Sequence, residues 1–440
     1  MAKSPSSSNG HSPAPASSSI DDLLLAALER GDESLETGRY IITYKQGAHE
    51  EGQASLAAAG MRVAHARDFT DQAMSMQDVG DADAVDFSEL GVALVSGDAF
   101  QSRGMSMAAL DADSPIEAIE PEHFMFADNV TSEYLRGFAR AASVITADWG
   151  QFEEDHGRNG ELKEPPTFEE QVLGATWGLK ACRVPTSSRS GVGIKVAVLD
   201  TGFDLGHPEF LGRAFTTASF VGQPVQDLNG HGTHTIGTAC GPRTPPGATQ
   251  RYGVAWRAPI FVGKVLTNAG SGTTATVLAG MNWAIANRCP VISMSLGASI
   301  GVQAAYTAAG QAALNAGCLI IAAAGNLSGA PTGAPANSPT IVSVASLDQN
   351  LAPSIFSSQG KIEIAAPGRD VFSSLPRPRL HGILSGTSMA TPHVAGCAAL
   401  LAETSPAMRG LVLRNRLLAL ARALPQPVGR VGRGLVQAIQ

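Results

Sequence analysis

From residue 193 onward, short apolar runs alternate with longer helix-like stretches. The runs occupy residues 193–200, 259–266, 290–297, 318–325 and 340–346, and helix-like stretches at 274–288 and 302–317 lie between them. Strands that are apolar throughout and alternate with helices are typical of a parallel sheet buried on both faces. We therefore predict an α/β fold with a mostly parallel central sheet over residues 166–440.

The N-terminal part of the chain has a different organisation. Residues 1–35 form a tail that is rich in Ser and Pro over its first 19 residues, which we expect to be disordered. The tail ends in DDLLLAALER, which we interpret as a short amphipathic helix. Residues 36–127 read as a small α+β domain, with strands at 39–45, 87–98 and 114–122 and a helix that ends at Gly60. Residues 128–165 read as a linker, with one short helix within it.

The net charge of −8 conceals an uneven distribution. Residues 36–127 carry 16 acidic and 5 basic side chains, a net charge of −11, whereas residues 166–440 carry 10 acidic and 20 basic side chains, a net charge of +10. Complementary charge steers association, so the two pieces are candidate partners of each other. The basic residues are scattered and no aromatic residues are interleaved with them, so we expect no nucleic-acid binding.

The sequence also bears on the cellular location of the protein and on the state of its cysteines. No apolar run reaches the 18 or so residues that a membrane-spanning helix needs, so we expect no membrane partner. The first residues have no apolar h-region, which predicts a cytoplasmic protein, with secretion by a non-standard route as the alternative. The five cysteines, in apolar contexts and without CxxC spacing, are expected to be free and buried.

Polar residues fall where the predicted strands end, and this is where parallel sheets bind ligands. Asp200 follows one run, and His231 and Ser388 each stand at the start of a predicted helix. A serine hydroxyl becomes a nucleophile when an imidazole takes its proton, and an acid orients that imidazole. The spacing of His231 and His234 differs from the i, i+4 pair of helical zinc sites, so we favour this reading over a metal pair.

The motifs around these residues resemble those of the subtilisin-like serine proteases, the subtilases. D-T-G contains Asp200, H-G-T-H begins with His231, G-T-S-M-A-T-P-H contains Ser388, and A-A-A-G-N ends at Asn326. The order acid, histidine, serine is the one the family uses. The resemblance implies the three-layer subtilisin-like fold and a triad of Asp200, His231 and Ser388, with Asn326 as the side-chain donor to the oxyanion.

The same resemblance implies a substrate cleft that holds an extended peptide. Its two walls are expected at Gly270, Ser271 and Gly272, and at Ser295, Leu296 and Gly297. The pocket for the residue before the scissile bond is expected to be lined by Ala323, Ala324, Gly325 and Gly333. Because these linings are small and uncharged, we expect a preference for a large apolar residue there. Ala334-Pro335 falls where the family often has a cis peptide bond.

Residues 36–127 loosely resemble the propeptide domain of subtilases, which acts as folding chaperone and inhibitor. Its C-terminal tail, 124–127, would lie in the cleft as a product. This predicts self-cleavage near 125–128, although the long linker leaves every position up to about 170 open for the mature start. The partners we expect are protein or peptide substrates and this propeptide.

No cofactor is expected to be required, and a structural calcium ion is an alternative that the sequence leaves open without indicating it. Many extracellular relatives bind calcium through an acid after the catalytic aspartate and a loop after the catalytic histidine. Glu209 occupies the acid position, but the loop at 241–253 has neither a carboxylate nor an Asn, so the sequence indicates no metal ligand. His234 and His393 are expected to be buried structural histidines.

The leading hypothesis is therefore an autoprocessing serine endopeptidase. Two alternatives remain at this point. One is a maturation protease dedicated to a single partner peptide inside the cell. The other is a pseudoprotease whose permanently docked N-terminal domain makes it a binding protein.

Overall fold

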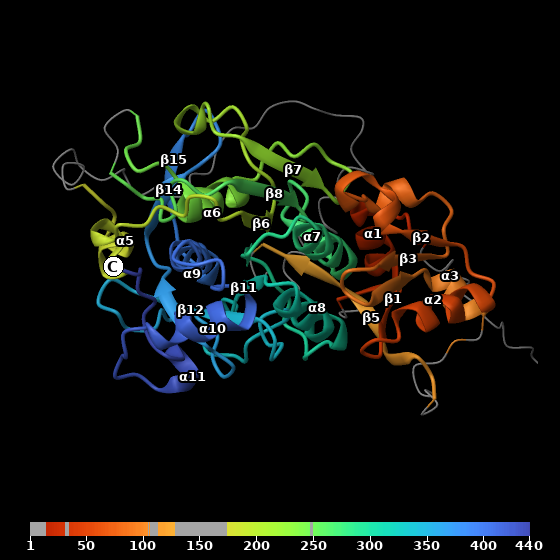
Figure 1. The fold of residues 1–440 in the computed structure, drawn as a ribbon. Coiled ribbons are helices and arrows are strands. Elements are labelled where there is room, and N and C mark those ends of the chain that lie inside the picture. Colours follow the sequence, from red (N-terminus) through yellow and green to blue (C-terminus); the bar gives the residue numbers. More distant parts are fainter. Residues whose placement is uncertain (1–14, 31–34, 104, 106–112, 128–173, 247–249) are drawn as a thin grey trace, which may run out of the picture.

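A computed structural model of the chain describes residues 15–30, 35–103, 105, 113–127, 174–246 and 250–440. They form two bodies in contact (Figure 1). The N-terminal domain packs against one side of the larger C-terminal domain, and strand β5 (Ile116–Phe126) runs from the first into the second. The predicted linker at 128–165, with its short helix, lies outside the described residues.

The C-terminal domain is built on a seven-stranded sheet in the order β13-β12-β11-β10-β6-β8-β7. All of its neighbouring strands are parallel. The strands are β6 (Val196–Asp200), β7 (Phe215–Ser219), β8 (Ile260–Lys264), β10 (Val291–Met294), β11 (Leu319–Ala323), β12 (Val342–Leu347) and β13 (Ile364–Pro367). The five predicted apolar runs are therefore strands of one parallel sheet, as expected.

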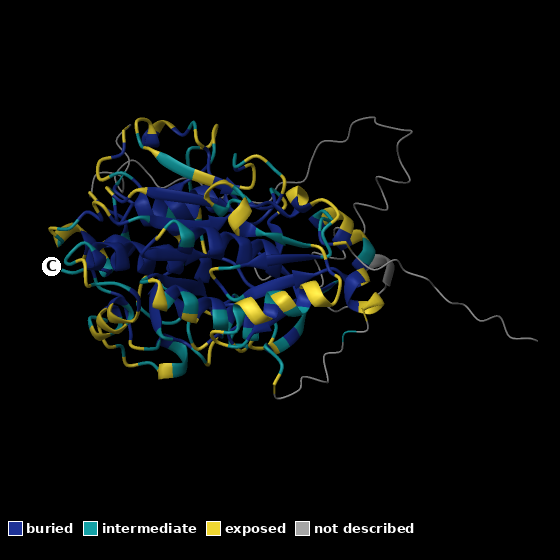
Figure 2. Ribbon diagram, turned by 45° about the vertical axis from the view of Figure 1, so that its right-hand side comes forward, coloured by how far each residue is buried: buried dark blue, intermediate teal, exposed yellow. Residues whose placement is uncertain are grey.

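The central strands are apolar throughout because helices cover both faces of the sheet. On β6, Val196 and Val198 belong to one hydrophobic cluster, whereas Ala197 and Leu199 belong to another. Helices α6 (His231–Cys240) and α9 (Thr387–Ala402) complete the first cluster. Helices α7 (Thr274–Ala286) and α8 (Ala304–Asn315) complete the second. The central strands of the sheet are accordingly buried (Figure 2), whereas the edge strand β7 is partly exposed.

Smaller elements surround these three layers. A two-stranded antiparallel hairpin, β14 (Val371–Ser374) and β15 (His381–Leu384), packs against α6. The remaining helices of this domain are α5 (Trp177–Ala181), α10 (Gly410–Ala419) and α11 (Val428–Val431), with short 3-10 turns η5 (Val184–Thr186) and η6 (Pro208–Phe210).

The N-terminal domain is a sheet in the order β2-β3-β4-β1-β5, which continues into β9 (Ser271–Thr273) of the C-terminal domain. Its elements are α1 (Ile20–Arg30), β1 (Glu36–Tyr44), α2 (His49–Ala58), β2 (Val63–His65), η1 (Ala66–Asp68), η2 (Thr70–Gln72), η3 (Met76–Val79), β3 (Ala84–Phe87), β4 (Val92–Val95) and α3 (Gly97–Ser102).

One predicted strand of this domain was wrong. Residues 87–98 read as a single strand, but β3 ends at Phe87 and β4 begins at Val92, and the two pair antiparallel. The turn between them contains Gly91 at φ 66°, a left-handed conformation that glycine adopts without steric cost. The alternation of apolar residues continues through this turn, so the pattern alone did not reveal it.

Both faces of the N-terminal sheet are buried, each against a different partner. Ile42, Ala93 and Val95 pack against α2 and α3. Ile41, Val85, Phe87, Val92 and Leu94 face the other way and belong to the cluster that contains α7 and α8. The C-terminal domain therefore supplies the second apolar layer that this small sheet requires.

Two carboxylates on β5 cap the helices across this interface. Glu122 accepts a hydrogen bond from the backbone N–H of Ala275 at 3.0 Å, near the start of α7. Glu120 accepts from the backbone N–H groups of Ala304 and Ala305, at the start of α8. The first N–H groups of a helix have no partner within it, and the helix dipole favours negative charge there. The N-terminal domain, which carries the net negative charge, thus contacts the N-terminal ends of α7 and α8 as well as their apolar side chains.

Two further expectations, on the cysteines and on the Ala334-Pro335 bond, are met. All five cysteines are free and buried. The Ala334-Pro335 peptide bond is cis. Among the described helices, none is long and apolar enough to cross a membrane.

Candidate active site

The predicted acid and histidine lie side by side at the carboxyl edge of the sheet. Asp200 is the last residue of β6, and its Oδ1 atom lies 2.8 Å from Nδ1 of His231, the first residue of α6. The carboxylate also accepts hydrogen bonds from the Thr201 backbone N–H and the Thr235 hydroxyl. Asp200 is 1% exposed, so this pair is shielded from water. Such a pair fixes the imidazole with its Nδ1 toward the acid.

Ser388 is the second residue of α9, whose helix packs against α6. Its hydroxyl lies 3.1 Å from the carbonyl oxygen of Ala127 and 3.3 Å from that of Ser295. The side chain of Ser295 donates in turn to the Ser388 carbonyl at 2.7 Å. The serine therefore meets the last described residue of the N-terminal domain.

Asn326 is held in one orientation by Thr387. Its Oδ1 atom accepts from the backbone N–H of Thr387 at 2.8 Å and from the Thr387 hydroxyl at 2.9 Å. These bonds keep the amide oxygen toward Thr387, so the amide nitrogen is on the opposite side. A Cβ atom at Gly386 would lie only 3.3 Å from that nitrogen. The glycine at position 386 therefore leaves room for the Asn326 amide beside the backbone that precedes Ser388.

The predicted cleft walls hold the tail 124–127. Phe124, Met125 and Phe126 pair antiparallel with Thr273, Gly272 and Ser271. On the other side, Phe126 and Gly297 exchange two backbone hydrogen bonds of 3.1 and 2.9 Å. The N–H of Ala127 donates to Gly270 O at 2.9 Å. Main-chain pairing of this kind is how a sheet edge captures an extended peptide.

The residues expected around the pocket are also brought together. Ala323 ends β11 and Ala324 follows it, two residues before Asn326. The buried residues of this group are Ala323, Ala324, Gly325, Gly333 and Leu296. Gly333 donates its N–H to Ala324 O at 3.3 Å, so these two predicted lining residues are neighbours. A Cβ atom at Gly333 would lie 2.3 Å from Ala298 O, which leaves no room for a side chain there.

Asp227 is a buried acid that the sequence did not single out. It accepts hydrogen bonds from the backbone N–H groups of Asn229, Gly230 and Thr233 and from the hydroxyls of Thr201 and Thr233. The carboxylate therefore satisfies the start of α6 from outside the helix, because Gly230 has no side chain to do so. A sequence signal was present: an acid four residues before a helix-starting histidine, with Asn-Gly between them.

Lys264 was missed as well. It is 0% exposed, and its ammonium group contacts Thr201 O and, at 2.8 Å, Asn268 Oδ1. Burial lowers the pKa of Lys264 to about 8, against the opposing influence of the Asp227 and Asp200 charges. The lysine is a cation beside two buried carboxylates, and nothing in its apolar strand indicated that position.

His234 and His393 are buried within helices, as expected for structural histidines. His234 Nε2 lies 2.9 Å from Val371 O, and His393 Nδ1 lies 2.9 Å from Met389 O. Burial lowers the pKa of His234 to about 3 and that of His393 to about 4. Both rings are therefore neutral at pH 7.

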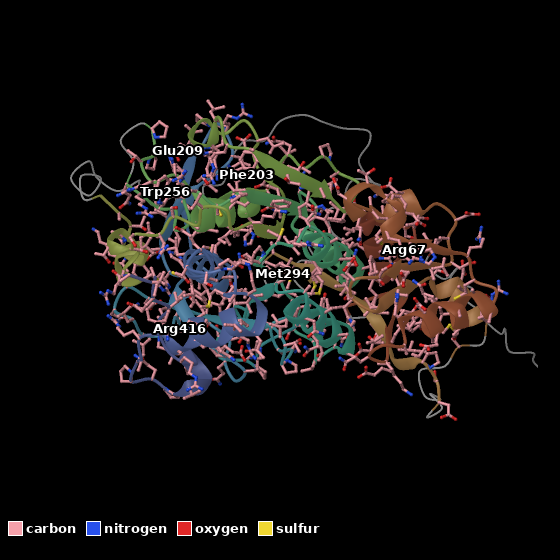
Figure 3. All side chains as sticks on the ribbon, viewed as in Figure 1. Arg67, Phe203, Glu209, Trp256, Met294 and Arg416 are labelled. Carbon is pink, nitrogen blue, oxygen red and sulfur yellow. The ribbon has the colours of Figure 1, made fainter. Side chains whose placement is uncertain are left out.

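The acid position of the expected calcium site has other partners. Glu209 contacts the Tyr252 hydroxyl, and its Oε1 lies 2.9 Å from His381 Nε2. Figure 3 labels this glutamate in the part of the molecule where β14 and β15 lie. A hydroxyl and an imidazole N–H are donors, whereas calcium requires oxygen acceptors around it. The residues present do not fit that metal, and among the described residues no group of three or more His, Cys, Asp or Glu could hold one.

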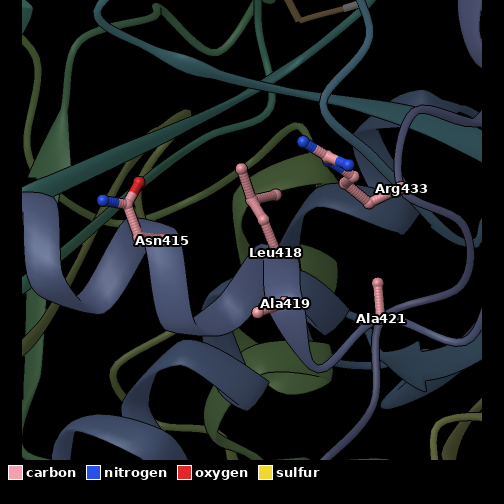
Figure 4. A pocket seen from close by; sticks show the side chains of 5 residues that line it. All are labelled: Asn415, Leu418, Ala419, Ala421 and Arg433. Carbon is pink, nitrogen blue, oxygen red and sulfur yellow. The ribbon is translucent and has the colours of Figure 1, made fainter.

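A surface depression lies away from these residues. A cavity of about 510 Å³ is lined by Asn415, Leu418, Ala419, Ala421 and Arg433, on α10 and the chain after it (Figure 4). It contains no acid–base pair or nucleophile.

The histidine pKa values predict a pH dependence of stability. Between about pH 4 and the ordinary value of 6.5, unfolded His393 binds a proton that the folded ring does not, so acidification through this window favours unfolding. In a Ser388→Ala background, His393→Gln should reduce the slope of unfolding free energy against pH by about 1.4 kcal/mol per unit near pH 5. Urea unfolding at several pH values measures this, and an unchanged slope would contradict it.

The Glu209 contacts predict indifference to calcium. Thermal unfolding of the Ser388→Ala protein should give the same midpoint with excess calcium and with a chelator, because the carboxylate already has two donors. Glu209→Gln should lower the midpoint equally in both conditions. A calcium-dependent rise in the midpoint that disappears in Glu209→Gln would show the expectation to be wrong.

Comparison with known proteins agrees with this geometry. The sequence profile of the subtilase family matches residues 191–434. A thermostable alkaline protease of Halalkalibacterium halodurans is 40% identical over 268 residues, which cover 60% of this chain and 72% of that protein. Subtilisin Savinase of Lederbergia lenta is 38% identical over 60% of this chain and 96% of its own length, and subtilisin E of Bacillus subtilis is 36% identical over 62% and 73%. The chain therefore belongs to the subtilase family and is a subtilisin-like serine endopeptidase.

Proposed function

We propose that this endopeptidase is made as a zymogen that cuts its own chain between Ala127 and Asp128. Residues 36–127 would then be the propeptide, and residues 1–35 an N-terminal extension before it. Residues 128–165 would be a linker, and residues 166–440 the catalytic domain. The observation that carries the proposal is the position of the Ser388 hydroxyl, 3.1 Å from the Ala127 carbonyl oxygen, with the preceding residues paired to both cleft walls.

The chemistry follows from the roles of four side chains. Ser388 Oγ adds to the carbonyl carbon of Ala127 while His231 takes the hydroxyl proton, and Asp200 stabilises the imidazolium. Asn326 and the Ser388 backbone N–H stabilise the oxyanion. His231 returns the proton to the nitrogen of Asp128 as the carbon–nitrogen bond breaks. Water then hydrolyses the acyl-enzyme by the same path, which leaves residues up to Ala127 as a product in the cleft.

Inhibition by the product is supported by contacts that the N-terminal domain makes outside the cleft. The N-terminal domain packs its second sheet face on α7 and α8, and Glu120 and Glu122 cap these helices. Burial raises the pKa of Glu120, against the influence of the Ala304 and Ala305 N–H groups. Burial also disfavours the Glu122 anion, but Arg39 and its hydrogen bonds keep the pKa of Glu122 below its usual value. Both caps lie outside the cleft, so the cut at Ala127 would leave them intact.

Self-cleavage is tested by intact mass over time. The wild-type chain should split between Ala127 and Asp128, and Ser388→Ala should stay whole. Asn326→Ala should still split, but on the order of 10²–10³-fold more slowly, because one oxyanion donor is lost. If the wild-type chain also stays whole and hydrolyses no unfolded protein, the binding-protein alternative becomes the better account.

We also propose that the pocket before the scissile bond prefers a large apolar residue. Its expected linings are alanine and glycine, whose small side chains leave space and carry no charge. Ala127 presents only a methyl group there, so the protein's own tail does not use that space. A buried carboxylate in such a pocket would lack a partner, and substrates with an acidic residue there should be poor.

Matched peptides test this preference. Peptides with Phe-Met-Phe followed by Phe, Ala or Glu differ only at the residue before the cut. We expect kcat/KM with Phe to exceed that with Ala by on the order of tenfold, as one additional buried apolar group provides, and Glu to be the poorest. A higher kcat/KM with Ala than with Phe would refute the proposed preference.

A further inference from the structure

Helix α1 precedes the proposed propeptide and lies outside the 191–434 region that the family profile matches. Its apolar residues Ile20, Leu23, Leu24 and Ala27 recur at the i, i+3, i+4 and i+7 spacing of one helix face. They are 6%, 1%, 0% and 3% exposed. The neighbouring Leu25, on another side of the helix, is 42% exposed. The apolar face of α1 is therefore buried against other parts of the protein.

This apolar face shares a hydrophobic cluster with the tail in the cleft. Ile20, Leu23, Leu24 and Ala27 form one hydrophobic cluster with Phe124 and Phe126 of the tail and with Val221 of the C-terminal domain. Side chains alternate along a strand, and Met125 and Ala127 accordingly belong to a different cluster. The side chains two and four residues before the scissile bond are thus packed with α1 and one residue of the protease.

The N-terminal end of α1 is fixed to the same interface. The Ser19 hydroxyl accepts from the Asp22 backbone N–H at 3.1 Å, which caps the helix start. The preceding Ala16 accepts from Arg39 Nη1 at 2.7 Å. Arg39 is 1% exposed, also binds Glu122, and lies 3.4 Å from the Thr273 hydroxyl beside the cleft. The segment before α1 is therefore joined to the residues that hold the tail.

We propose that α1 is a second inhibitory element, which retains the cleaved tail in the cleft by covering Phe124 and Phe126. This inference rests on the proposed self-cleavage and concerns the regulation of the same site. After the Ala127–Asp128 bond is cut, residues 15–127 stay bound without a covalent link. Phe124 and Phe126 cannot leave the cluster until the apolar face of α1 separates from Val221 or from the two rings. The rate at which active protease appears is therefore limited by the rate at which α1 dissociates from this cluster.

Two neighbouring leucines provide a matched pair of variants. Leu24→Asp places a charge in the buried cluster, and Leu25→Asp places the same charge on the exposed side of the same helix. In the full-length chain, intact mass gives the time of self-cleavage, and hydrolysis of a chromogenic peptide gives the time at which activity appears. We expect Leu24→Asp to shorten the interval between the two events by on the order of 10- to 100-fold, which corresponds to one buried leucine. Leu25→Asp should match the wild type.

A second readout separates this proposal from self-cleavage. In the Ser388→Ala background, hydrogen exchange should report the amides of Phe126 and Ala127, which donate to Gly297 O and Gly270 O. Leu24→Asp should accelerate their exchange and Leu25→Asp should not. If the wild type fails to cut itself, the proposed function fails. The exchange rates still test whether α1 holds the tail in the cleft. Should Leu24→Asp fail to fold, Leu24→Ala provides the milder change. Equal exchange rates in the variants at Leu24 and Leu25, or equal activation intervals, would overturn the role of α1.

Discussion

The antiparallel pairing of β5 with β9 is the contact on which the rest of the arrangement depends. It makes the N-terminal sheet continuous with a wall of the cleft, and it sets the register in which Ala127 reaches Ser388. Because side chains alternate along a strand, a shift of one residue would exchange the two faces of the tail. Phe126 would then enter the cluster of Met125, and the glutamates of β5 would lose the ends of α7 and α8. One register thus fixes the position of Ala127 at Ser388, the helix caps and the apolar contacts together.

A second constraint is the polar network beneath Asp200 and His231. A buried carboxylate is stable only when its oxygens have donors, and Asp227 obtains five from the loop and helix around the histidine. Thr201 links the two acids, since its backbone N–H donates to Asp200 and its hydroxyl to Asp227. Lys264 contributes the compensating positive charge and contacts the same threonine. The position of the imidazole is therefore determined by a loop rather than by the helix alone.

The sequence predicted the parts whose pattern is local. The five apolar strands were recognisable because both faces are buried, and the motif residues were found because each stands at a strand or helix end. β7 and β13 were missed, and both are edge strands of the sheet. The first is partly exposed and contains two threonines, and the second ends at a proline. Thr387 was missed as a supporting residue because its partner Asn326 lies far away in sequence. Asp227 bonds mainly to residues two to six positions later, and its role was missed because this acid stands before the helix whose start it satisfies. The contact of α1 with Phe124 likewise joins residues about a hundred positions apart, which no periodicity reveals.

Residues 124–127 have to satisfy two requirements with the same four side chains. They must fit the cleft as a substrate does, and they must also complete the core of the domain that precedes them, where Met125 and Phe124 are 0% exposed. If residues 36–127 are the inhibitor that we propose, a mutation that reshapes the cleft for another peptide would also weaken their binding unless residues 124–127 changed with it. On that proposal, specificity and self-cleavage would depend on distant parts of the chain that have to change together. Engineered variants with altered selectivity would need a tail redesigned to match.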